Sequence, residues 1–447
     1  MGNGNSSKNS SKTNMNKKFI FSFLFFASFC NFEARGIEET GDVEVNYCIE
    51  NAVTADFIKN VVYPNDDYSY TKISDYINQE TQYRKDLPSP VRIEVPITND
   101  GEALVLETFL HELQVRSDTF VVGQRALEIW NLIPQTSYTY KLFVLGSDHT
   151  KSEVCNGTFK TEGQERMMNI DGMANFRDIG GWKLSNGQYV KYDKIFRSAE
   201  LEKTSDKNSM ITAAGIYELL ETQGIDVEID FSDYDGSPVS DRLEYIRGSN
   251  YQITPYVDGL KNTGTKYKNC FEKTVNSLRE GKKVLFHCNL GADRTGTFAF
   301  LLEGLLGVSE SDLAKDYELT SFIFDNRYRN ISKNTVEEAK YLDYKGLVEY
   351  VKNTFSGTTF NEKIEKMALN FGISQKDIND FRELMTEYLE GDADGNGIID
   401  EADIVAMVNS IMGLPSPHFV KEAANLNGDK EVNAADIVKL INLLHKD

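Results

Sequence analysis

The pattern of apolar and polar positions changes twice along this chain and divides it into three parts. Between about residues 36 and 165 apolar residues alternate with polar ones, as in residues 91–95 and in the longer run 132–144, which predicts half-buried strands. From about 166 to 389 short apolar runs alternate with stretches of helical spacing, which predicts an α/β domain with a parallel sheet core. Beyond residue 390 each of two acidic loops leads into a short apolar helix, 404–412 and 437–444.

One junction in the middle part carries chemistry. The apolar strand Val284-Leu285-Phe286 is followed by His-Cys-Asn-Leu-Gly-Ala-Asp-Arg-Thr over residues 287–295, and then by an apolar helix that stops at Gly307. Backbone N–H groups at a helix N-terminus and an arginine together bind phosphate oxygens. A cysteine in that field ionises easily, and its thiolate is a nucleophile. The spacing therefore predicts a phosphate-transfer site built on Cys288 and Arg294.

This loop resembles the HCxxGxxR(S/T) signature of the protein tyrosine phosphatases and their dual-specificity relatives. Three further segments resemble the atypical bacterial and fungal members: N-F-R-D-I-G-G at 175–181, F-R-S-A-E-L at 196–201 and D-Y-E-L-T at 316–320. The resemblance runs from about residue 166 to about 390. One segment departs from it, because these members usually have I-D-L-R where this chain reads G-I-D-V-E-I-D-F-S over residues 224–232.

The resemblance implies a role for each residue of the loop. Cys288 attacks phosphorus and forms a phosphocysteine, Thr295 hydrogen-bonds the sulfur, and His287 orients the loop. The phosphoryl oxygens are held by the loop amides and the guanidinium group, from Asn289, Leu290, Gly291, Ala292, Asp293 and Arg294. The reaction implied in this way uses no cofactor.

The leaving group needs a proton, and two aspartates are candidates to donate it. Asp258 precedes Cys288 by 30 positions, in Pro-Tyr-Val-Asp-Gly at 255–259, a spacing similar to the mobile acid loop of dual-specificity phosphatases. Asp293 lies inside the phosphate loop beside Arg294. Proximity favours Asp293, and Asp258 remains the alternative.

The substrate is open at this point. Phosphotyrosine in a protein is implied by the family, whereas inositol phosphates, phosphoinositides and other small phosphomonoesters are alternatives. Ala292 stands where relatives with lipid activity often have lysine, which disfavours the polyanionic lipids. A catalytically silent module that binds a phosphorylated ligand is an alternative of a different class. The net charge of −21 excludes a nucleic-acid partner and requires a local positive pocket for any phosphate.

The last part of the chain contains two copies of a calcium loop. The ligand positions one, three, five, seven, nine and twelve are filled first by Asp392, Asp394, Asn396, Ile398 (through its carbonyl), Asp400 and Asp403, and then by Asn425, Asn427, Asp429, Glu431, Asn433 and Asp436. This duplication resembles a type I dockerin, which implies structural Ca²⁺ and a cohesin-like partner. Because the second copy has Asn425 at its first position and Lys430 at its sixth, we expect it to bind calcium more weakly.

The N-terminal residues predict export. Lys17-Lys18 precede an apolar run over residues 19–29, which is typical of a secretory signal and too short for a membrane span. We therefore expect a protein that is secreted, at the cell surface or in the periplasm, with no membrane-spanning helix. The predicted divisions are a signal region at 1–35, a β-sandwich at 36–165, the phosphatase-like domain at 166–389 and the small α-helical dockerin at 390–447.

Two features concern the predicted sandwich. The alternating run 132–144 resembles the tyrosine-corner strand of fibronectin type III modules, in which a tyrosine hydroxyl bonds to upstream backbone. Cys48 and Cys155 fall near the first and last strands of this part. An exported protein can join such a pair in a disulfide, and two free thiols are the alternative.

Overall fold

The computed structural model describes residues 45–63, 76, 87–96, 101–202, 210–232, 236–323, 344–414, 416 and 418–445. The predicted signal at 1–35 lies outside these residues. No helix of the described part is long and apolar enough to cross a lipid bilayer.

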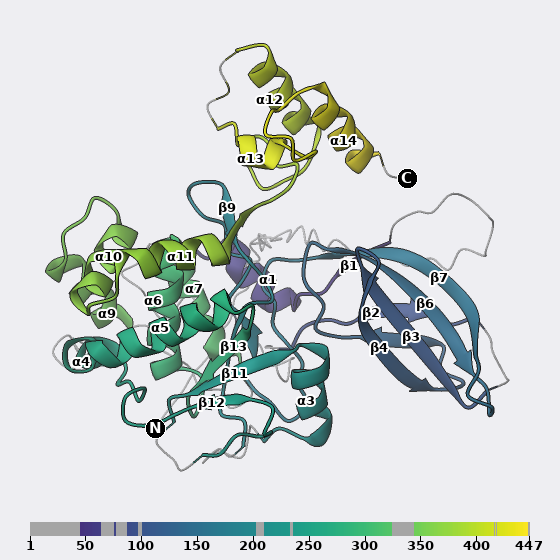
Figure 1. Cartoon of the computed structure of the whole chain (residues 1–447), viewed down its shortest axis with the longest axis horizontal. Coiled ribbons are helices and arrows are strands. Elements are labelled where there is room, and N and C mark those ends of the chain that lie inside the picture. Colours follow the sequence, from purple (N-terminus) through teal and green to yellow (C-terminus); the bar gives the residue numbers. More distant parts are fainter. Residues whose placement is uncertain are drawn as a thin grey trace, which may run out of the picture. The chain divides into compact units, whose positions relative to one another are not determined.

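A five-stranded sheet forms the centre of the α/β domain, in the order β12-β11-β13-β10-β8. Figure 1 labels its strands β11, β12 and β13. Four neighbouring strands run parallel, and β8 pairs antiparallel with β10 at the edge. The strands are β8 (Arg177–Asp178), β10 (Ile195–Ser198), β11 (Ile225–Asp230), β12 (Glu244–Ile246) and β13 (Lys283–His287). The prediction of a parallel core is therefore confirmed, within a sheet that is mixed as a whole.

Helix α6 (Asp293–Leu306) begins directly after the phosphate loop and is buried from Thr295 to its last residue. Because it is enclosed on all sides, its apolar residues are not confined to one stripe, and Glu303 is buried among them. The ring of Phe298 packs edge-on against Phe286 of β13, with centroids 5.1 Å apart. The helix ends at Gly307, whose φ of 103° is the left-handed conformation of a C-terminal cap. The predicted helix is confirmed, and it begins at Asp293, within the run 287–295.

The remaining helices of this domain pack around the sheet and α6 (Figure 1). They are α3 (Ala213–Tyr217), the π-helix η1 (Glu218–Thr222), α4 (Tyr256–Asn262), α5 (Gly264–Arg279), α7 (Glu310–Leu319), the 3-10 helix η2 (Thr320–Phe322), α9 (Tyr344–Thr354), α10 (Phe360–Asn370) and α11 (Gln375–Met385). The helical spacing of residues 375–389 predicts a single helix, but α11 stops at Met385. Residues 386–388 instead form β14 (Thr386–Tyr388), which pairs antiparallel with β9 (Gln188–Val190).

The segment before the α/β domain contains two sheets that share one apolar core. One sheet has the order β1-β7-β6-β3-β4, and the other pairs β2 with β5. The strands are β1 (Val45–Cys48), β2 (Val91–Glu94), β3 (Ala103–Leu110), β4 (Leu113–Val121), β5 (Ala126–Ile129), β6 (Ser137–Leu145) and β7 (Lys151–Glu162). The Ile133 N–H donates to the Tyr138 hydroxyl at 3.1 Å, which is the bond that the tyrosine-corner resemblance predicts.

The prediction of strands throughout this segment is wrong for residues 52–60, which form helix α1 (Ala52–Asn60). Asn51 caps the helix by accepting a hydrogen bond from the Val53 N–H at 2.9 Å. Phe57 and Ile58 of α1 are buried within the core of the α/β domain and not within that of the two sheets. An all-β description of residues 36–165 is therefore not confirmed.

The structure also decides between the two readings of the N-terminal cysteines, since Cys48 and Cys155 are both free. Cys48 stands opposite Glu162 of β7 in the β1–β7 pair. Cys155 lies on the same strand β7, seven residues before Glu162 (162 − 155). At the rise of an extended strand, Cys155 is therefore roughly 23 Å from Glu162, the residue opposite Cys48. Disulfide-bonded cysteines need Cα atoms within about 7 Å of each other.

The described residues of the C-terminal part form three helices, α12 (Glu401–Ile411), α13 (Lys421–Ala424) and α14 (Ala434–Leu444). Its small core joins residues from both loop–helix units, among them Ala406, Met407 and Leu440. Each unit therefore buries its apolar face against the other, as a duplicated unit too small to fold alone must do.

A core substitution tests this packing. Phe271 of α5 is fully buried, and its ring packs against Phe381 of α11 with centroids 5.2 Å apart. We expect Phe271→Ala to lower the free energy of unfolding of the α/β domain by about 3–5 kcal/mol, because the lost apolar contact also leaves a cavity. Urea unfolding can be followed by Trp182 fluorescence after Trp130→Phe removes the other tryptophan.

Met210→Ala is the control for this measurement, because Met210 is 71% exposed. We expect this change to shift the unfolding free energy by less than about 0.5 kcal/mol. A Phe271→Ala effect as small as that of the control would contradict the described packing of α5 on α11.

Candidate active site

The predicted phosphate loop lies at the carboxyl end of the central strand β13 and opens into α6, as the sequence pattern implies. Gly291 has a φ of 63°, and a Cβ atom added to it would lie 2.3 Å from the Ser198 carbonyl oxygen. Only glycine fits so close to the end of β10 in this conformation. The loop is thus held against the end of the neighbouring strand β10.

Cys288 is 3% exposed, and burial by itself would raise the pKa of its thiol. The charge of Arg294, the Thr295 hydroxyl and the backbone N–H groups of Thr295 and Ala292 outweigh burial, so the pKa is lowered from its ordinary value. The Thr295 hydroxyl makes no hydrogen bond of ordinary geometry within the described part of the chain, so it acts on the sulfur as a nearby dipole. The arrangement favours the thiolate.

Arg294 is in the first turn of α6, and two bonds hold its guanidinium group in front of the loop. One nitrogen donates to the Phe231 carbonyl, and another donates to the Asn289 side-chain oxygen at 3.0 Å. Phe231 follows β11 directly, so the central strands position both the nucleophile and the cation. The planar guanidinium can exchange these neutral acceptors for two phosphate oxygens.

His287 points into the protein beneath the loop. Its Nε2 atom lies 2.9 Å from Glu228 Oε1, and its Nδ1 atom lies 3.8 Å from Asp230 Oδ1. Burial would lower the pKa of His287, but the hydrogen bond to Glu228 and the nearby carboxylates outweigh it and raise the pKa to about 9. The imidazolium is therefore charged at neutral pH and tied to two carboxylates of β11.

The edge where related chains have I-D-L-R is occupied differently here. Ser232 stands in place of the arginine and is fully buried. Arg247, just beyond β12, brings a guanidinium group to the same edge, where it pairs with Asp230 at 3.2 Å and donates to the Ser232 carbonyl at 3.5 Å. A cation is thus present at this edge, carried by the segment that follows β12 rather than by the one that follows β11.

Two side chains hold the loop carbonyl groups from behind. The Asn175 amide donates to the carbonyls of Leu290 and Gly291 at 2.9 and 3.0 Å, and Arg197 donates to the Gly291 carbonyl at 3.0 Å. Asn175 is completely buried and has a φ of 55°, a conformation that asparagine tolerates better than most residues. These bonds orient the peptide groups of the phosphate loop.

Asp316 of α7 anchors this support. Arg177 donates to Asp316 Oδ1 at 2.9 Å and to its carbonyl oxygen at 2.8 Å, while Arg197 pairs with the other carboxylate oxygen. Burial and the neighbouring Arg177 lower the pKa of Arg197 to about 10, which leaves it charged at neutral pH. Two arginines share one carboxylate, so the cluster keeps positive charge behind the loop.

The two candidate acids differ in their surroundings. Asp258 is exposed in the first turn of α4, and no described hydrogen bond or ion pair joins it to the phosphate loop. Asp293 is the first residue of α6, and its carboxylate accepts a hydrogen bond from the Tyr256 hydroxyl. Of the two, Asp293 is the one placed at the loop.

The first calcium loop brings carboxylates together. Asp392, Asp394 and Asp403 each place an oxygen within 4.8 Å of the others, and the buried Asp392 Oδ1 has no hydrogen-bond partner in the described part of the chain. Burial, together with the charge of Asp394, raises the pKa of Asp392 and of Asp403. Crowded carboxylates with an unpaired buried oxygen fit a bound Ca²⁺ ion.

The second loop repeats the backbone of the first. Asp403 accepts the N–H groups of Asp394 and Asp400 at 3.0 and 2.9 Å, and Asp436 accepts those of Asn427 and Asn433 at 2.9 and 3.0 Å. The sixth position is left-handed in both copies, with a φ of 88° at Gly397 and 76° at Lys430. The loop geometry is therefore kept, although the carboxylates at the positions that bind through a side chain are reduced to Asp429 and Asp436, because the seventh position, Glu431, offers its carbonyl.

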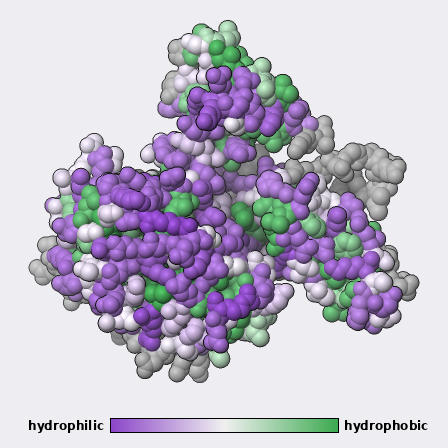
Figure 2. Space-filling model, viewed as in Figure 1, coloured by the Kyte–Doolittle hydropathy of each residue, from purple (hydrophilic) through white to green (hydrophobic). Residues whose placement is uncertain are grey.

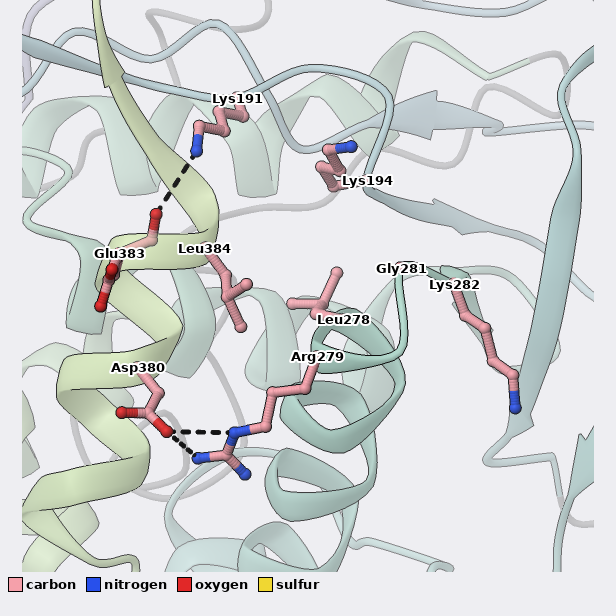
Figure 3. Close-up of a pocket in the computed structure, with 9 residues that line it drawn as sticks. All are labelled: Lys191, Lys194, Leu278, Arg279, Gly281, Lys282, Asp380, Glu383 and Leu384. Carbon is pink, nitrogen blue, oxygen red and sulfur yellow. Dashed lines mark hydrogen bonds and ion pairs between the residues drawn. The ribbon is translucent and has the colours of Figure 1, made fainter.

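A pocket of about 560 Å³ lies elsewhere and is shown in Figure 3. Lys194 and Lys282 line it, just before β10 and near the start of β13, so it lies at the opposite end of these parallel strands from the phosphate loop. Arg279 in this pocket pairs with Asp380, at 3.1 Å from its Nε atom, and Lys191 donates to the Glu383 carbonyl at 3.3 Å. None of the predicted site residues lines it.

The sequence motifs marked several of these positions without revealing their roles. The segments that carry the family resemblance contain Asn175, Arg177, Arg197 and Asp316. Their place in these segments was the sequence signal that could have assigned them to the site. Tyr256 had no signal beyond its place two residues before Asp258.

Comparisons with known proteins agree with the motifs. Residues 168–387 match the tyrosine phosphatase family, and residues 390–445 match the dockerin type I domain. A provisionally named tyrosine-protein phosphatase of Cupriavidus necator is 26% identical over 174 residues, which cover 33% of this chain and 60% of that protein. A tyrosine-protein phosphatase of Nostoc commune is 32% identical over 72 residues, 16% of this chain and 24% of that protein. This chain therefore spans only part of each relative.

Among solved structures, the crystal structure of P. aeruginosa TpbA is 14% identical and covers 43% of this chain and 96% of that chain, with a TM-score of 0.24. A score this low carries no argument about the fold. This chain therefore contains a segment that matches the tyrosine phosphatase family at residues 168–387, followed at residues 390–445 by a segment that matches the dockerin type I domain.

Proposed function

We propose that this protein hydrolyses phosphate monoesters through a covalent intermediate on Cys288. The thiolate attacks phosphorus, the bond to the leaving oxygen breaks, and that oxygen takes a proton from Asp293. Water then gives a proton back to the Asp293 carboxylate and attacks the phosphorus of the phosphocysteine, and the P–S bond breaks to release inorganic phosphate and the thiolate. Arg294 and the loop N–H groups bind the equatorial oxygens, which carry the charge of the transition state.

The observation that carries this proposal is the buried Cys288 thiol whose pKa is lowered, at the point where β13 meets α6. A buried thiol without such surroundings has a pKa that is raised instead of lowered. Cys270 of α5 is also buried, and burial raises its pKa well above the ordinary value. The contrast supports a nucleophile at Cys288 and argues against a silent module that only binds a phosphorylated ligand.

We further propose phosphotyrosine in a protein as the substrate. Within the loop 288–294, Arg294 is the one cationic side chain, because Ala292 occupies the position that carries lysine in relatives with lipid activity. One guanidinium group matches a single phosphate better than a ligand with several. The relatives named as tyrosine-protein phosphatases support the same class.

Substitution of the two buried cysteines tests the nucleophile. We expect Cys288→Ser to abolish hydrolysis of p-nitrophenyl phosphate, because the seryl hydroxyl is not ionised at neutral pH. Cys270→Ser is the matched control and should retain activity close to wild type. Equal activity of the Cys288→Ser and Cys270→Ser proteins would rule out the proposed chemistry.

Leaving-group dependence tests the acid. We expect Asp293→Asn to slow phenyl phosphate hydrolysis on the order of a hundredfold, and p-nitrophenyl phosphate hydrolysis much less, because p-nitrophenolate departs without a proton. Asp258→Asn should slow both substrates equally or not at all. If the leaving-group dependence instead appears in the Asp258 variant, Asp258 is the acid.

For the C-terminal domain we propose a cohesin-like partner and a secreted or cell-surface location. Exposed apolar side chains recur 33 residues apart on α12 and α14: Val405 and Val408 on the first, Val438 and Ile441 on the second. Figure 2 shows hydrophobic surface on this domain among hydrophilic surface. Exposed apolar side chains on two equivalent helices suit a protein-binding surface. Structural Ca²⁺ in the first loop would hold α12 in place.

Calcium titration of the full chain by calorimetry tests this part. We expect Asp403→Ala to weaken the tighter binding event by more than about tenfold, because a carboxylate ligand is lost where three converge. Asp436→Ala, its equivalent in the second loop, should leave that event unchanged. The absence of calcium-dependent heat in the wild-type protein would contradict the proposal.

A further inference from the structure

Tyr256 occupies an unusual conformation beside the phosphate loop. Its φ is 58°, in the left-handed region that a bulky residue seldom adopts, and it is 6% exposed. The turn around it is tight: the Gly259 N–H donates to the Pro255 carbonyl at 3.2 Å, and a Cβ atom on Gly259 would lie 1.5 Å from the Thr254 oxygen. Such a conformation persists only where surrounding contacts hold it, often at a functional site.

The contacts that hold Tyr256 lead to the first turn of α6. Its backbone N–H donates to the Thr297 hydroxyl at 3.0 Å, and that hydroxyl donates to the Asp293 carbonyl at 2.8 Å. Its own hydroxyl donates to the Asp293 carboxylate. The backbone and the side chain of Tyr256 are thus both tied to the residue that we propose as the acid.

A second tyrosine completes the arrangement. The hydroxyl groups of Tyr256 and Tyr317 lie 2.6 Å apart, and their rings pack edge to face at 6.4 Å. Because the single proton of the Tyr256 hydroxyl goes to Asp293, Tyr317 is the donor in the tyrosine pair. Tyr317 packs on α6 in turn, since a Cβ atom on Gly296 would lie 3.0 Å from its ring. The hydrogen bonds therefore run in one direction, from Tyr317 through Tyr256 to Asp293.

This direction matters for proton transfer. An oxygen that already accepts a hydrogen bond from Tyr256 is the carbonyl-like oxygen of the protonated carboxyl group. The transferable proton then resides on the other oxygen, Oδ2, which is presented in one orientation. Without the Tyr256 hydroxyl the carboxyl group can rotate, and proton delivery loses its alignment with the leaving oxygen.

We propose that Tyr256 is a positioning residue that orients the Asp293 carboxyl group for protonation of the leaving oxygen. This inference rests on the proposed function of Asp293. It also gives the Pro-Tyr-Val-Asp-Gly segment a use that does not involve Asp258, whose side chain is exposed.

Tyr256→Phe tests the proposal, because it removes the hydroxyl and keeps the buried ring. We expect kcat to fall by about tenfold with phenyl phosphate and by less than about twofold with p-nitrophenyl phosphate, since one hydrogen bond to the acid is lost. In the Asp293→Asn background the same change should cost nothing further, because a residue that acts through Asp293 has no effect once the acid is gone.

Tyr267→Phe is the matched control. Tyr267 is buried, and its hydroxyl donates to the Thr254 carbonyl at 2.7 Å in the same turn and lies near the Thr297 hydroxyl, but no described hydrogen bond joins it to the Asp293 carboxylate. If loosening of the turn were the cause, this variant would show the same leaving-group dependence as Tyr256→Phe. We expect no such dependence.

The outcomes separate this inference from the proposed function. Equal losses with both substrates, or a full additional loss in the Asp293→Asn background, overturn the role of Tyr256 alone. Absence of leaving-group dependence in the Asp293→Asn single variant overturns the acid assignment, and the role of Tyr256 with it. The proposal is likewise contradicted if the loss in the double variant equals the product of the losses in Tyr256→Phe and Asp293→Asn to within about twofold.

Discussion

Asp316 accepts hydrogen bonds from Arg177 and Arg197 in a place that is almost closed to water, since all three side chains are at most 3% exposed. Two guanidinium groups cannot be buried next to each other without a shared counter-charge. Once Asp316 holds them, Arg197 and the Arg177-bound Asn175 can reach the carbonyl groups of the phosphate loop. The shape of the loop therefore depends on a carboxylate that never meets the substrate.

The planarity of the peptide bond transmits this support to the front of the loop. In a trans peptide group the C=O and the following N–H point in opposite directions. Because Asn175 and Arg197 draw the Gly291 carbonyl backwards, the Ala292 N–H is turned the other way, toward the Cys288 sulfur, whereas the Gly291 N–H donates to the Cys288 carbonyl at 3.4 Å. The Ala292 amide is thus oriented before any ligand arrives, which is the condition for effective electrostatic stabilisation.

Three positively charged side chains surround the Cys288 thiol. Arg294 lies in front of Cys288, Arg197 lies behind the loop, and the imidazolium of His287 lies beneath it. Together they offset the cost of burying a thiolate in a chain whose net charge is −21. The acidic calcium loops use charge in a different way, because their carboxylates repel one another until a cation binds between them.

The sequence by itself determined the features that lie within one short segment. The active-site loop is one example, since Cys288, Arg294 and the start of α6 lie within seven positions of one another. Three other features are equally local: the calcium-loop spacing, the left-handed cap at Gly307 and the tyrosine corner. Local backbone geometry follows from residue type and spacing, so these could be predicted. The Asp316 cluster joins residues 119 and 139 positions apart, and Tyr256 meets Asp293 across 37. Similarly, α1 joins the α/β core, and residues 386–388 extend as a strand where a helix was expected. Only tertiary packing decided these, because which distant side chains meet depends on the path of the whole chain, which no local pattern encodes.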